Sequence, residues 1–313
     1  MSVESRQSGG TAATYRSSAI ARQTTLITDY RVFMDIRFVL LAATTALSLA
    51  SAVYAQPAAR GGPPPQPDWI LTIGAAPVYS PVFQGSEDYG LSVFPDLRVN
   101  YKDVFFASVP DGVGYNLINK TINNANWKVG PLVKVRFGRE EDTGGSPFLI
   151  SGETNGLRGM GTVDTAGELG GFAQYSSANT RTRVELRQGF GGHEGVVGEV
   201  SLSYVDRVGR LSYSIGPRLS FGSSDFMHTY FGINRQQSVS TGLAQYEADG
   251  GVNSWGIGGS AVLPLGNVMA LTLFTGFDRI GKQAADSPLI RQRGDQNQFS
   301  IGLGFGYRFG WNN

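Results

Sequence analysis

The sequence predicts an all-β protein: a transmembrane, antiparallel, up-and-down β-barrel of about 12 strands, with long extracellular loops and short periplasmic turns. The clearest observation is the stretch 298–309. Every second residue from Phe299 to Phe309 is large and apolar there, and the residues between are Ser, Gly or Arg. Because strand side chains alternate between two faces, this strand has one apolar face and one small or polar face. Aromatic residues near its end favour a lipid-facing surface, since aromatic side chains settle at the membrane interface.

Two further observations support a barrel. The mean hydropathy is slightly negative, as expected when half of each membrane strand is polar. Many short alternating runs occur in a chain that contains 43 Gly, which is typical of an all-β protein. A soluble β-sandwich is the alternative, and it would bury the apolar face in a core and need no aromatic girdle. An export signal and the aromatic terminal strand both argue against it.

The bulk composition excludes several classes of function. The 26 basic and 25 acidic side chains nearly cancel, so nothing suggests a nucleic-acid partner. The chain has no Cys, which excludes disulfides and thiolate metal sites. The glycines within 189–195 lack the strand-to-helix context of a phosphate-binding loop and indicate a tight hairpin instead. We therefore expect no cofactor.

Four segments are expected along the chain: a leader at 1–33, a signal peptide at 34–55, a Pro/Gly-rich linker at 56–68 and the barrel at 69–313. In the signal peptide, Arg37 precedes a short apolar run that ends in small residues before Gln56. A membrane anchor helix would need a longer uninterrupted apolar span. Because signal sequences start at the N-terminus, translation is expected to begin at Met34. The leader would then be a mis-assigned or disordered segment.

Alternating runs separated by turn residues are expected to form the strands. In the run 126–137, for example, Trp127 and Val133 face outward, whereas Lys128 and Lys134 face the lumen. The runs are 69–79, 90–101, 103–109, 112–118, 126–137, 165–176, 180–190, 196–205, 210–221, 252–263, 267–280 and 297–309.

Connection lengths give an independent check, because bacterial barrels place short turns on the periplasmic side and long loops outside. If Trp69 starts from the periplasm, the long connections fall outside and both ends of the barrel fall inside. The turn signal Pro110-Asp111-Gly112 must then be an outer connection. The expected outer connections are 80–89, 110–111, 138–164, 191–195, 222–251 and 281–296. The expected inner connections lie near 102 and at 119–125, 177–179, 206–209 and 264–266.

Charged side chains gather on the face that would line the lumen. One hypothesis is a pore lining that selects anions. The other is a plugged barrel, in which the inward Arg and Glu side chains pair with one another, and the modest interior of a twelve-stranded barrel favours this second hypothesis. The residues expected in this lumen set are Lys134, Arg136, Arg181, Arg183, Glu185, Arg187, Glu199, Arg218 and Arg308, with Lys128 and Glu168 beside them.

Catalysis must be considered, because barrels of this size include hydrolases. A catalytic triad needs a His within hydrogen-bond reach of its nucleophile. His193 and His228 both lie in expected outer loops, without a neighbouring Gly-x-Ser-x-Gly elbow. We expect them to be solvated, and two are too few for a His-rich metal site. The chain is therefore expected not to be an enzyme, with a rim-located hydrolase as the remote alternative.

Six stretches carry a family resemblance. They read PVFQGSEDY at 81–89, FGREED at 137–142, LRGMG at 157–161, GGHEG at 191–195, FMHTYFG at 226–232 and ADSPLI at 285–290. In this order, the chain from about Trp69 to Phe309 resembles the MipA/OmpV family of outer-membrane proteins, or MltA-interacting proteins. The motif residues singled out by the resemblance are Gly85, Ser86, Asp88, Tyr89, Gly192, His193, Tyr230, Phe231, Gly232, Ser287 and Pro288.

The resemblance implies a barrel in the outer membrane, in contact with lipid and lipopolysaccharide. It also implies a scaffold or interaction role for murein-remodelling enzymes, with a murein lytic transglycosylase and a murein synthase as the partners. A periplasmic partner would contact the inner turns or the linker at 56–67, because the large loops point away from the periplasm. A narrow porin-like channel is the alternative function.

Overall fold

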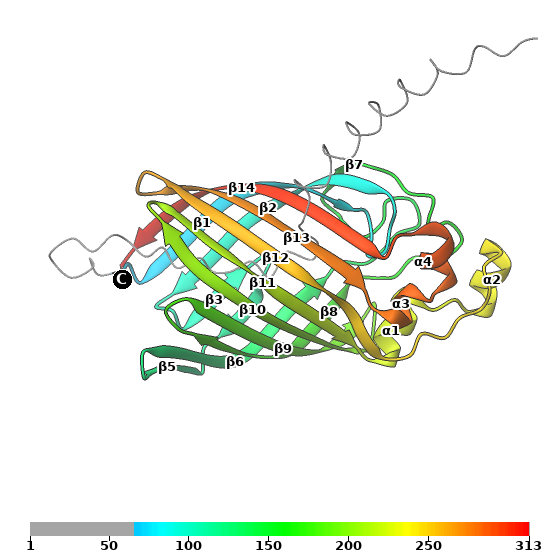
Figure 1. Cartoon of the computed structure of the whole chain (residues 1–313), viewed down its shortest axis with the longest axis horizontal. Helices are drawn as coiled ribbons and strands as arrows, with labels where there is room; N and C mark the ends of the chain where they lie inside the picture. The colour runs from blue at the N-terminus through cyan, green and yellow to red at the C-terminus, as the bar shows by residue number, and fades with distance from the viewer. Residues whose placement is uncertain (1–65, 313) are drawn as a thin grey trace, which may run out of the picture. The chain divides into compact units, whose positions relative to one another are not determined.

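The computed structural model describes residues 66–312, and these form a closed antiparallel barrel (Figure 1). Of its fourteen strands, β5 and β7 lie outside the ring, which leaves twelve. The ring closes because β1 pairs with both β14 and β2. The predicted fold class and strand number are therefore confirmed. The ring strands are β1 (Trp69–Pro81), β2 (Tyr89–Tyr101), β3 (Phe105–Ser108), β4 (Gly112–Tyr115), β6 (Ala125–Arg136), β8 (Ala166–Ser176), β9 (Thr180–Gly191), β10 (Val196–Val208), β11 (Leu211–Gly222), β12 (Gly251–Leu265), β13 (Met269–Ile280) and β14 (Asn297–Trp311).

The predicted alternation of β14 holds in the structure. Phe305 is 46% exposed on the outer face, whereas Gly302 and Gly304 are buried on the inner face. The same contrast recurs in β6, where Val135 is 61% exposed and Leu132 is fully buried. Apolar side chains that point outward around a ring have a low free energy only when hydrocarbon surrounds them. The outer surface of the barrel is therefore the lipid-facing surface.

Aromatic rings gather where β1, β2 and β14 meet at the end of the barrel that carries the chain terminus. Trp69 lies 4.5 Å from Tyr101 and 6.1 Å from Trp311, measured between ring centroids. Register places Trp69 opposite both of these residues. Rings at this position form part of an interfacial girdle, since amphipathic rings prefer the headgroup region.

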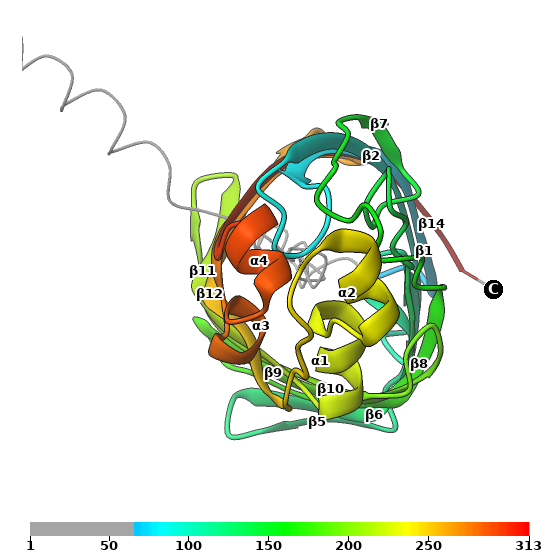
Figure 2. The same ribbon diagram turned by 90° about the vertical axis from the view of Figure 1, so that its right-hand side faces the viewer.

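The other end of the barrel carries the long connections, and four helices cover it (Figures 1 and 2). The helices were not expected from the sequence. They are short, because each is confined to a loop that returns to the barrel wall. None of the helices in residues 66–312 is long and apolar enough to cross a membrane. They are α1 (Ser224–Phe231), α2 (Arg235–Thr241), α3 (Lys282–Ala285) and α4 (Pro288–Arg293).

Two expected strands are shorter in the structure, and two strands were missed. The expected run 103–109 is β3, and the run 112–118 stops at Tyr115. The chain then leaves the ladder, because Asn116 donates its side-chain amide to the carbonyl of Asp103 at 2.7 Å. A fifth strand, β5 (Ile118–Ile122), starts at the last residue of the expected run 112–118, extends into the expected inner connection 119–125 and pairs with β6.

The hairpin between β5 and β6 has a two-residue turn. Asn123 and Asn124 occupy it with φ of 50° and 62°. Asn tolerates this left-handed backbone better than most residues, and positive φ at both turn positions matches the right-handed twist of the strands. The remaining missed strand is β7 (Leu149–Ser151), inside the expected outer connection 138–164.

The ladder of paired residues in the barrel wall is shortest beside β4. Only two residue pairs join β4 to β6, Val113↔Val133 and Gly114↔Leu132. The hairpin of β3 and β4 also ends well below the outer rim, since Ser108 pairs with Arg98, close to the inner end of β2 at Tyr101. The expected outer connection at 110–111 is therefore a turn inside the wall rather than a surface loop. Above it, β7 covers the outer part of β2.

The predicted leader and signal peptide lie outside the described residues, as does the linker up to residue 65.

Candidate functional site

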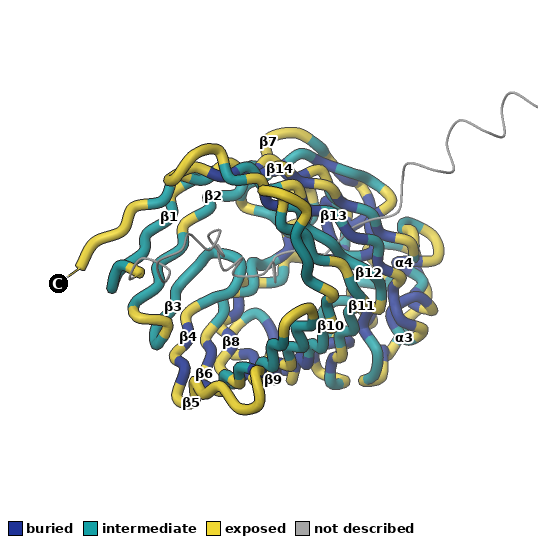
Figure 3. Tube along the Cα trace, turned by 60° about the vertical axis from the view of Figure 1, so that its left-hand side comes forward, coloured by how far each residue is buried: buried dark blue, intermediate teal, exposed yellow. Residues whose placement is uncertain are grey.

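The outer end of the barrel is closed by a cap, defined here as residues 82–88, 137–165, 192–195, 223–250 and 281–296. The cap has a continuous apolar core, and buried residues concentrate at this end (Figure 3). Viewed from the helix end, the helices and loops lie across the mouth of the ring (Figure 2). The buried core residues are Val82, Phe83, Leu157, Met160, Val197, Phe226, Met227, Phe231, Ile233, Leu243, Ala248, Ile280, Ala284, Ala285, Leu289 and Ile290.

Residues of the family-like motifs hold separate cap loops together. Ser287 is fully buried and donates its hydroxyl to the carbonyl of Phe231 at 2.6 Å. The same hydroxyl accepts from the amide of Leu289, so Ser287 caps α4, with Pro288 at the first helical position. Gly232 ends α1. One hydroxyl therefore ties α4 to the end of α1.

A second group of motif residues joins the loop 82–88 to β14. Gly85 has a φ of 94° and donates its amide to the Oε1 of Gln298 at 2.8 Å. The hydroxyl of Ser86 accepts the amide of Asp88, and the hydroxyl of Tyr89 accepts the amide of Phe299. A side chain at Gly85 would need a strained backbone and would collide with Ile290.

His193 is buried, which corrects the expectation of a solvated loop histidine. Its Nε2 lies 3.1 Å from the Oε1 of Glu168, and its ring packs edge-on against Phe226. The loop turns inward at Gly192, where a Cβ would come within 1.7 Å of the carbonyl oxygen of Asp164. The close backbone approach requires glycine and directs the next side chain into the barrel. His228, in contrast, is exposed on α1.

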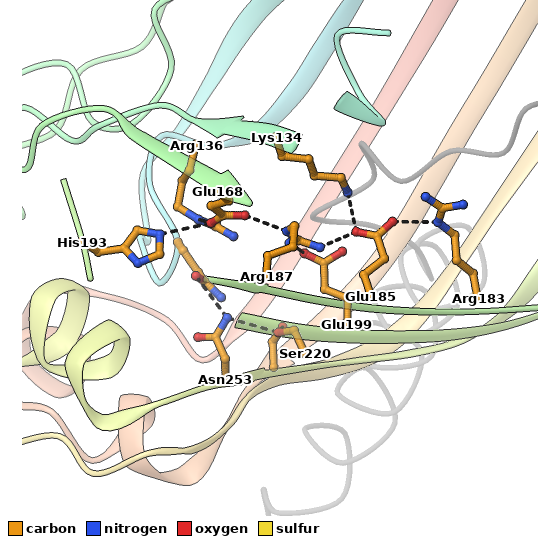
Figure 4. Close-up of polar contacts among 12 residues, drawn as sticks. Lys134, Arg136, Glu168, Arg183, Glu185, Arg187, His193, Glu199, Ser220 and Asn253 are labelled. Atoms are coloured by element: carbon orange, nitrogen blue, oxygen red, sulfur yellow. Dashed lines mark hydrogen bonds and ion pairs between the residues drawn. The ribbon is translucent and has the colours of Figure 1, made fainter. Parts of the chain in front are cut away.

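Beneath the cap lies a connected set of ion pairs, which we call the lumen network (Figure 4). Arg187 is its centre, 1% exposed, and it contacts three carboxylates. Its Nε lies 2.7 Å from Glu168, one Nη bonds Glu185, and the other lies 2.6 Å from Glu199. Such charge-assisted bonds satisfy a guanidinium that water cannot reach.

The remaining cations bind the same carboxylates. Lys134 and Arg183 both pair with Glu185, at 2.7 and 2.6 Å, and Arg136 pairs with Glu168 at 2.5 Å. Four neighbouring strands supply these side chains: β6, β8, β9 and β10. Antiparallel register sets Lys134 opposite Glu168 and Glu199 opposite Glu185. The inward positions were predictable from alternation, but the pairs between strands depend on register.

Three residues of the expected lumen set are not part of the lumen network. Arg218 binds Asp278 through two bonds of 2.9 and 2.7 Å, separately from the network. Arg308 lies opposite Thr72 on the far wall. Arg181 is on the inward face of β9, and its buried Nε has no hydrogen-bond partner. The sequence reasoning missed Asp278, although its inward position on β13 was a usable signal.

The cap also contains a buried cation outside the lumen set. Arg139 is 4% exposed, donates to the carbonyl of Tyr230 at 2.7 Å and lies over its ring. Burial lowers the pKa of Arg139 to about 10, so it is still charged at neutral pH. Burial also raises the pKa of the Tyr230 hydroxyl, which is neutral there. Arg139 thus fixes the loop 137–148 against α1.

The outer surface carries a cavity of about 720 Å³ beside α1. His228 and the carboxylates of Glu194, Asp225, Glu247 and Asp249 line it. Within residues 66–312, no group of three or more His, Asp or Glu side chains is arranged to hold a metal ion.

Comparisons of the sequence with known proteins agree with an outer-membrane barrel. A family profile described as "MltA-interacting protein MipA" matches residues 73–309. The chain is 30% identical over 118 residues to the Escherichia coli K12 protein named "Putative outer membrane protein YiaT", a match that covers 37% of this chain and 45% of that relative. The match thus spans less than half the length of the curated relative.

Among solved structures, the chain is similar to a NanC porin, with 10% identity, a TM-score of 0.36, and coverage of 76% of this chain and 98% of that one. It is also similar to OmpT of Vibrio cholerae, with 7% identity, a TM-score of 0.34, and coverage of 77% and 97%. Because these identities and TM-scores are low, the fold assignment depends on the strand pairing described above and not on these similarities.

Proposed function

Because the chain belongs to the MltA-interacting protein MipA family, we propose that this outer-membrane β-barrel is a non-catalytic scaffold whose periplasmic side binds murein-remodelling enzymes. The partners would be a murein lytic transglycosylase and a murein synthase. Lipid and lipopolysaccharide would surround the apolar belt and the cap.

One observation carries this proposal: the cap closes the outer end of the barrel with its own apolar core. Directly below, the lumen network fills the space between β6, β8, β9 and β10 with paired charges. A barrel closed on its outer side presents only its periplasmic turns and lower lumen to proteins of the cell wall.

The chemistry of the buried histidine supports a role without catalysis. The Nε2 of His193 is next to a carboxylate, and its Nδ1 is buried without a hydrogen-bond partner. A general base needs a hydroxyl or a water to deprotonate within hydrogen-bond reach. In the described part of the chain, the ring of His193 contacts the aromatic side chains of Phe226 and Tyr230 instead.

The test is cross-linking in intact envelopes, then purification of the solubilised barrel and mass spectrometry of the captured proteins. We expect a murein hydrolase or synthase with the unmodified chain. Reversing the charge of exposed periplasmic-side residues (Lys102→Glu, Lys120→Glu and Arg210→Glu) should abolish its capture. The matched control is Arg235→Glu on α2, at the opposite end, which should leave capture intact. Recovery of the barrel without any cell-wall enzyme would exclude this function.

A narrow channel is the second candidate, and the exposure of two network residues favours it. Arg136 and Glu199 are 29% and 31% exposed although both face the lumen, so water reaches part of the network. A channel predicts that Arg136→Ala or Arg183→Ala changes ion selectivity in planar bilayers. A scaffold predicts that the same substitutions leave capture of the enzyme unchanged.

A further inference from the structure

We propose that Arg181 and Arg183 form an anion-binding site in the lumen, below the network, which takes a carboxylate or phosphate group. This proposal goes beyond the scaffold function and does not depend on it.

Two guanidinium nitrogens carry the first argument. The Nε of Arg181 and the Nη2 of Arg183 are both buried and have no hydrogen-bond partner. A buried N–H without an acceptor loses its hydration and gains nothing in return, and the loss is greater for a charged group. Two such donors, two positions apart on one strand, are available to one shared acceptor.

The position of Arg183 is fixed by its other contacts. Its Nε lies 2.6 Å from Glu185, its Nη1 donates to the Oε1 of Gln174, and the guanidinium lies 4.3 Å from the ring centroid of Phe172. Figure 4 shows Arg183 at the edge of the network, beyond Glu185. Stacking on a ring leaves the edge of the guanidinium plane available for a planar oxyanion.

The neighbouring strands surround both arginines with neutral polar groups. Ser176 and Ser203 lie opposite Arg181 in register, on β8 and β10. Ser201 lies opposite Arg183 on β10. Hydroxyl groups can donate to an anion, whereas a carboxylate at any of these positions would have occupied the guanidinium groups.

The balance of charge points the same way. Glu185, the carboxylate bound to Arg183, is shared with Lys134 and Arg187. Arg181 interacts electrostatically with Arg183 and with Asp111, but it forms no ion pair among residues 66–312. Positive charge is therefore in excess here, since one carboxylate serves three cations and Arg181 has none of its own, and such a field attracts anions.

The spacing fits a single oxyanion. Residues two apart on a strand share a face and have Cα atoms about 7 Å apart. Two long arginine side chains at this distance can converge on the oxygens of one carboxylate or phosphate. An anion would reach this site from the periplasmic side of the lumen, because side-chain exposure along β9 rises from 1% at Arg187 to 16% at Arg183.

The test is isothermal titration calorimetry of the full chain in detergent micelles, at constant ionic strength, with inorganic phosphate and with acetate as the probes. We expect at least one probe to bind. Arg181→Gln and Arg183→Gln should each weaken its binding by roughly tenfold or more. Arg279→Gln is the matched control, since this exposed arginine already bonds Asn297 and Gln296. The stronger probe separates a carboxylate ligand from a phosphate ligand.

Thermal unfolding without the probes gives a second readout. Arg181→Gln should raise the melting temperature, because it removes a charged group whose buried Nε lacks an acceptor. A structural role for Arg181 would lower it. Absence of binding for both probes, or binding that neither substitution weakens, would overturn the proposal.

Discussion

Arg187 shows how a single residue organises the lumen. Its guanidinium binds Glu168, Glu185 and Glu199, and it is almost completely buried. Buried ion pairs often stabilise no more than apolar side chains of the same volume would. Removing Arg187 is different, because Glu168 and Glu185 stay buried and each loses one of the cations that compensate it. The stability of the network therefore depends on Arg187 more than on its peripheral cations.

We expect Arg187→Met to lower the free energy of unfolding by about 3 kcal/mol or more, since two buried carboxylates lose a direct partner. The measurement is urea unfolding in micelles, followed by circular dichroism. Arg279→Met, at an exposed arginine, should change the same free energy by less than about 0.5 kcal/mol. Equal effects of the two substitutions would show that the network adds no stability.

At the scale of a structural element, one carboxylate, that of Glu141, holds the loop 137–165 in its conformation through two hydrogen bonds. Glu141 accepts the amides of Gly159 and Gly161 at 3.0 and 2.7 Å, with both glycines at positive φ. These two bonds hold the pKa of the Glu141 carboxyl below its usual range. Because the pKa is lowered by folding, the clamp contributes at neutral pH and is lost as pH falls through that lowered pKa.

Hydrogen-exchange protection of the Gly159 and Gly161 amides should therefore be present at pH 7 and decrease below about pH 4.3, the ordinary Glu value. Protection factors, which correct for the intrinsic pH dependence of exchange, give the measurement. Glu141→Gln should reduce protection at pH 7 and remove its dependence on acid pH. If amide protection in the variant depends on pH as it does in the unmodified chain, a group other than Glu141 controls the loop.

The strands were predictable from sequence because lipid imposes a two-residue period on them. Val135 and Phe305 had to face outward, and Arg187 inward, whatever the loops did. No such period marks the cap. Its helices are stabilised by contacts between distant loops, such as that of Ser287 with Phe231, and these are invisible to a local pattern.

The candidate site was predictable only in part, for a similar reason. Alternation identified the inward charges, but which carboxylate each cation binds depends on the register of β6, β8, β9 and β10. The burial of His193 depends on the backbone contact at Gly192, which the local sequence does not encode. Asp278 was overlooked although it occupies an inward position of a predicted strand.

At the scale of the whole molecule, the barrel combines a lipid-facing wall, a closed outer end and a polar lumen. The cap core and the network are stacked on one another, since Arg136 lies 5.1 Å from the ring centroid of Phe226. Closure of the outer end of the barrel therefore depends on both the cap and the lumen network. This dependence can be tested by removing part of the cap.

We expect the unmodified protein to show no stable conductance in planar bilayers. Replacing residues 224–249 with a short Gly/Asn turn should produce conducting channels, because this removes α1 and α2 from the mouth. These channels should prefer anions, since the lumen network contains four cations, Lys134, Arg136, Arg183 and Arg187, against three carboxylates. The control is Val239→Ser, at a residue 82% exposed on α2, which should leave the membrane silent. A silent loop-deletion variant with an intact barrel would show that the network alone blocks passage.

The joint between β4 and β6 has a mechanical consequence. Lateral tension on a ring is carried equally by every seam, so the ring tears at the seam with the fewest rungs. The shortest ladders surround the hairpin of β3 and β4. Four rungs join β3 to each of its neighbours, and two join β4 to β6, followed by the five of β5, whereas the ladder between β1 and β14 near the chain terminus is longer. A stretched membrane would thus rupture this wall beside the short hairpin of β3 and β4, while the seam that closes the barrel stayed intact.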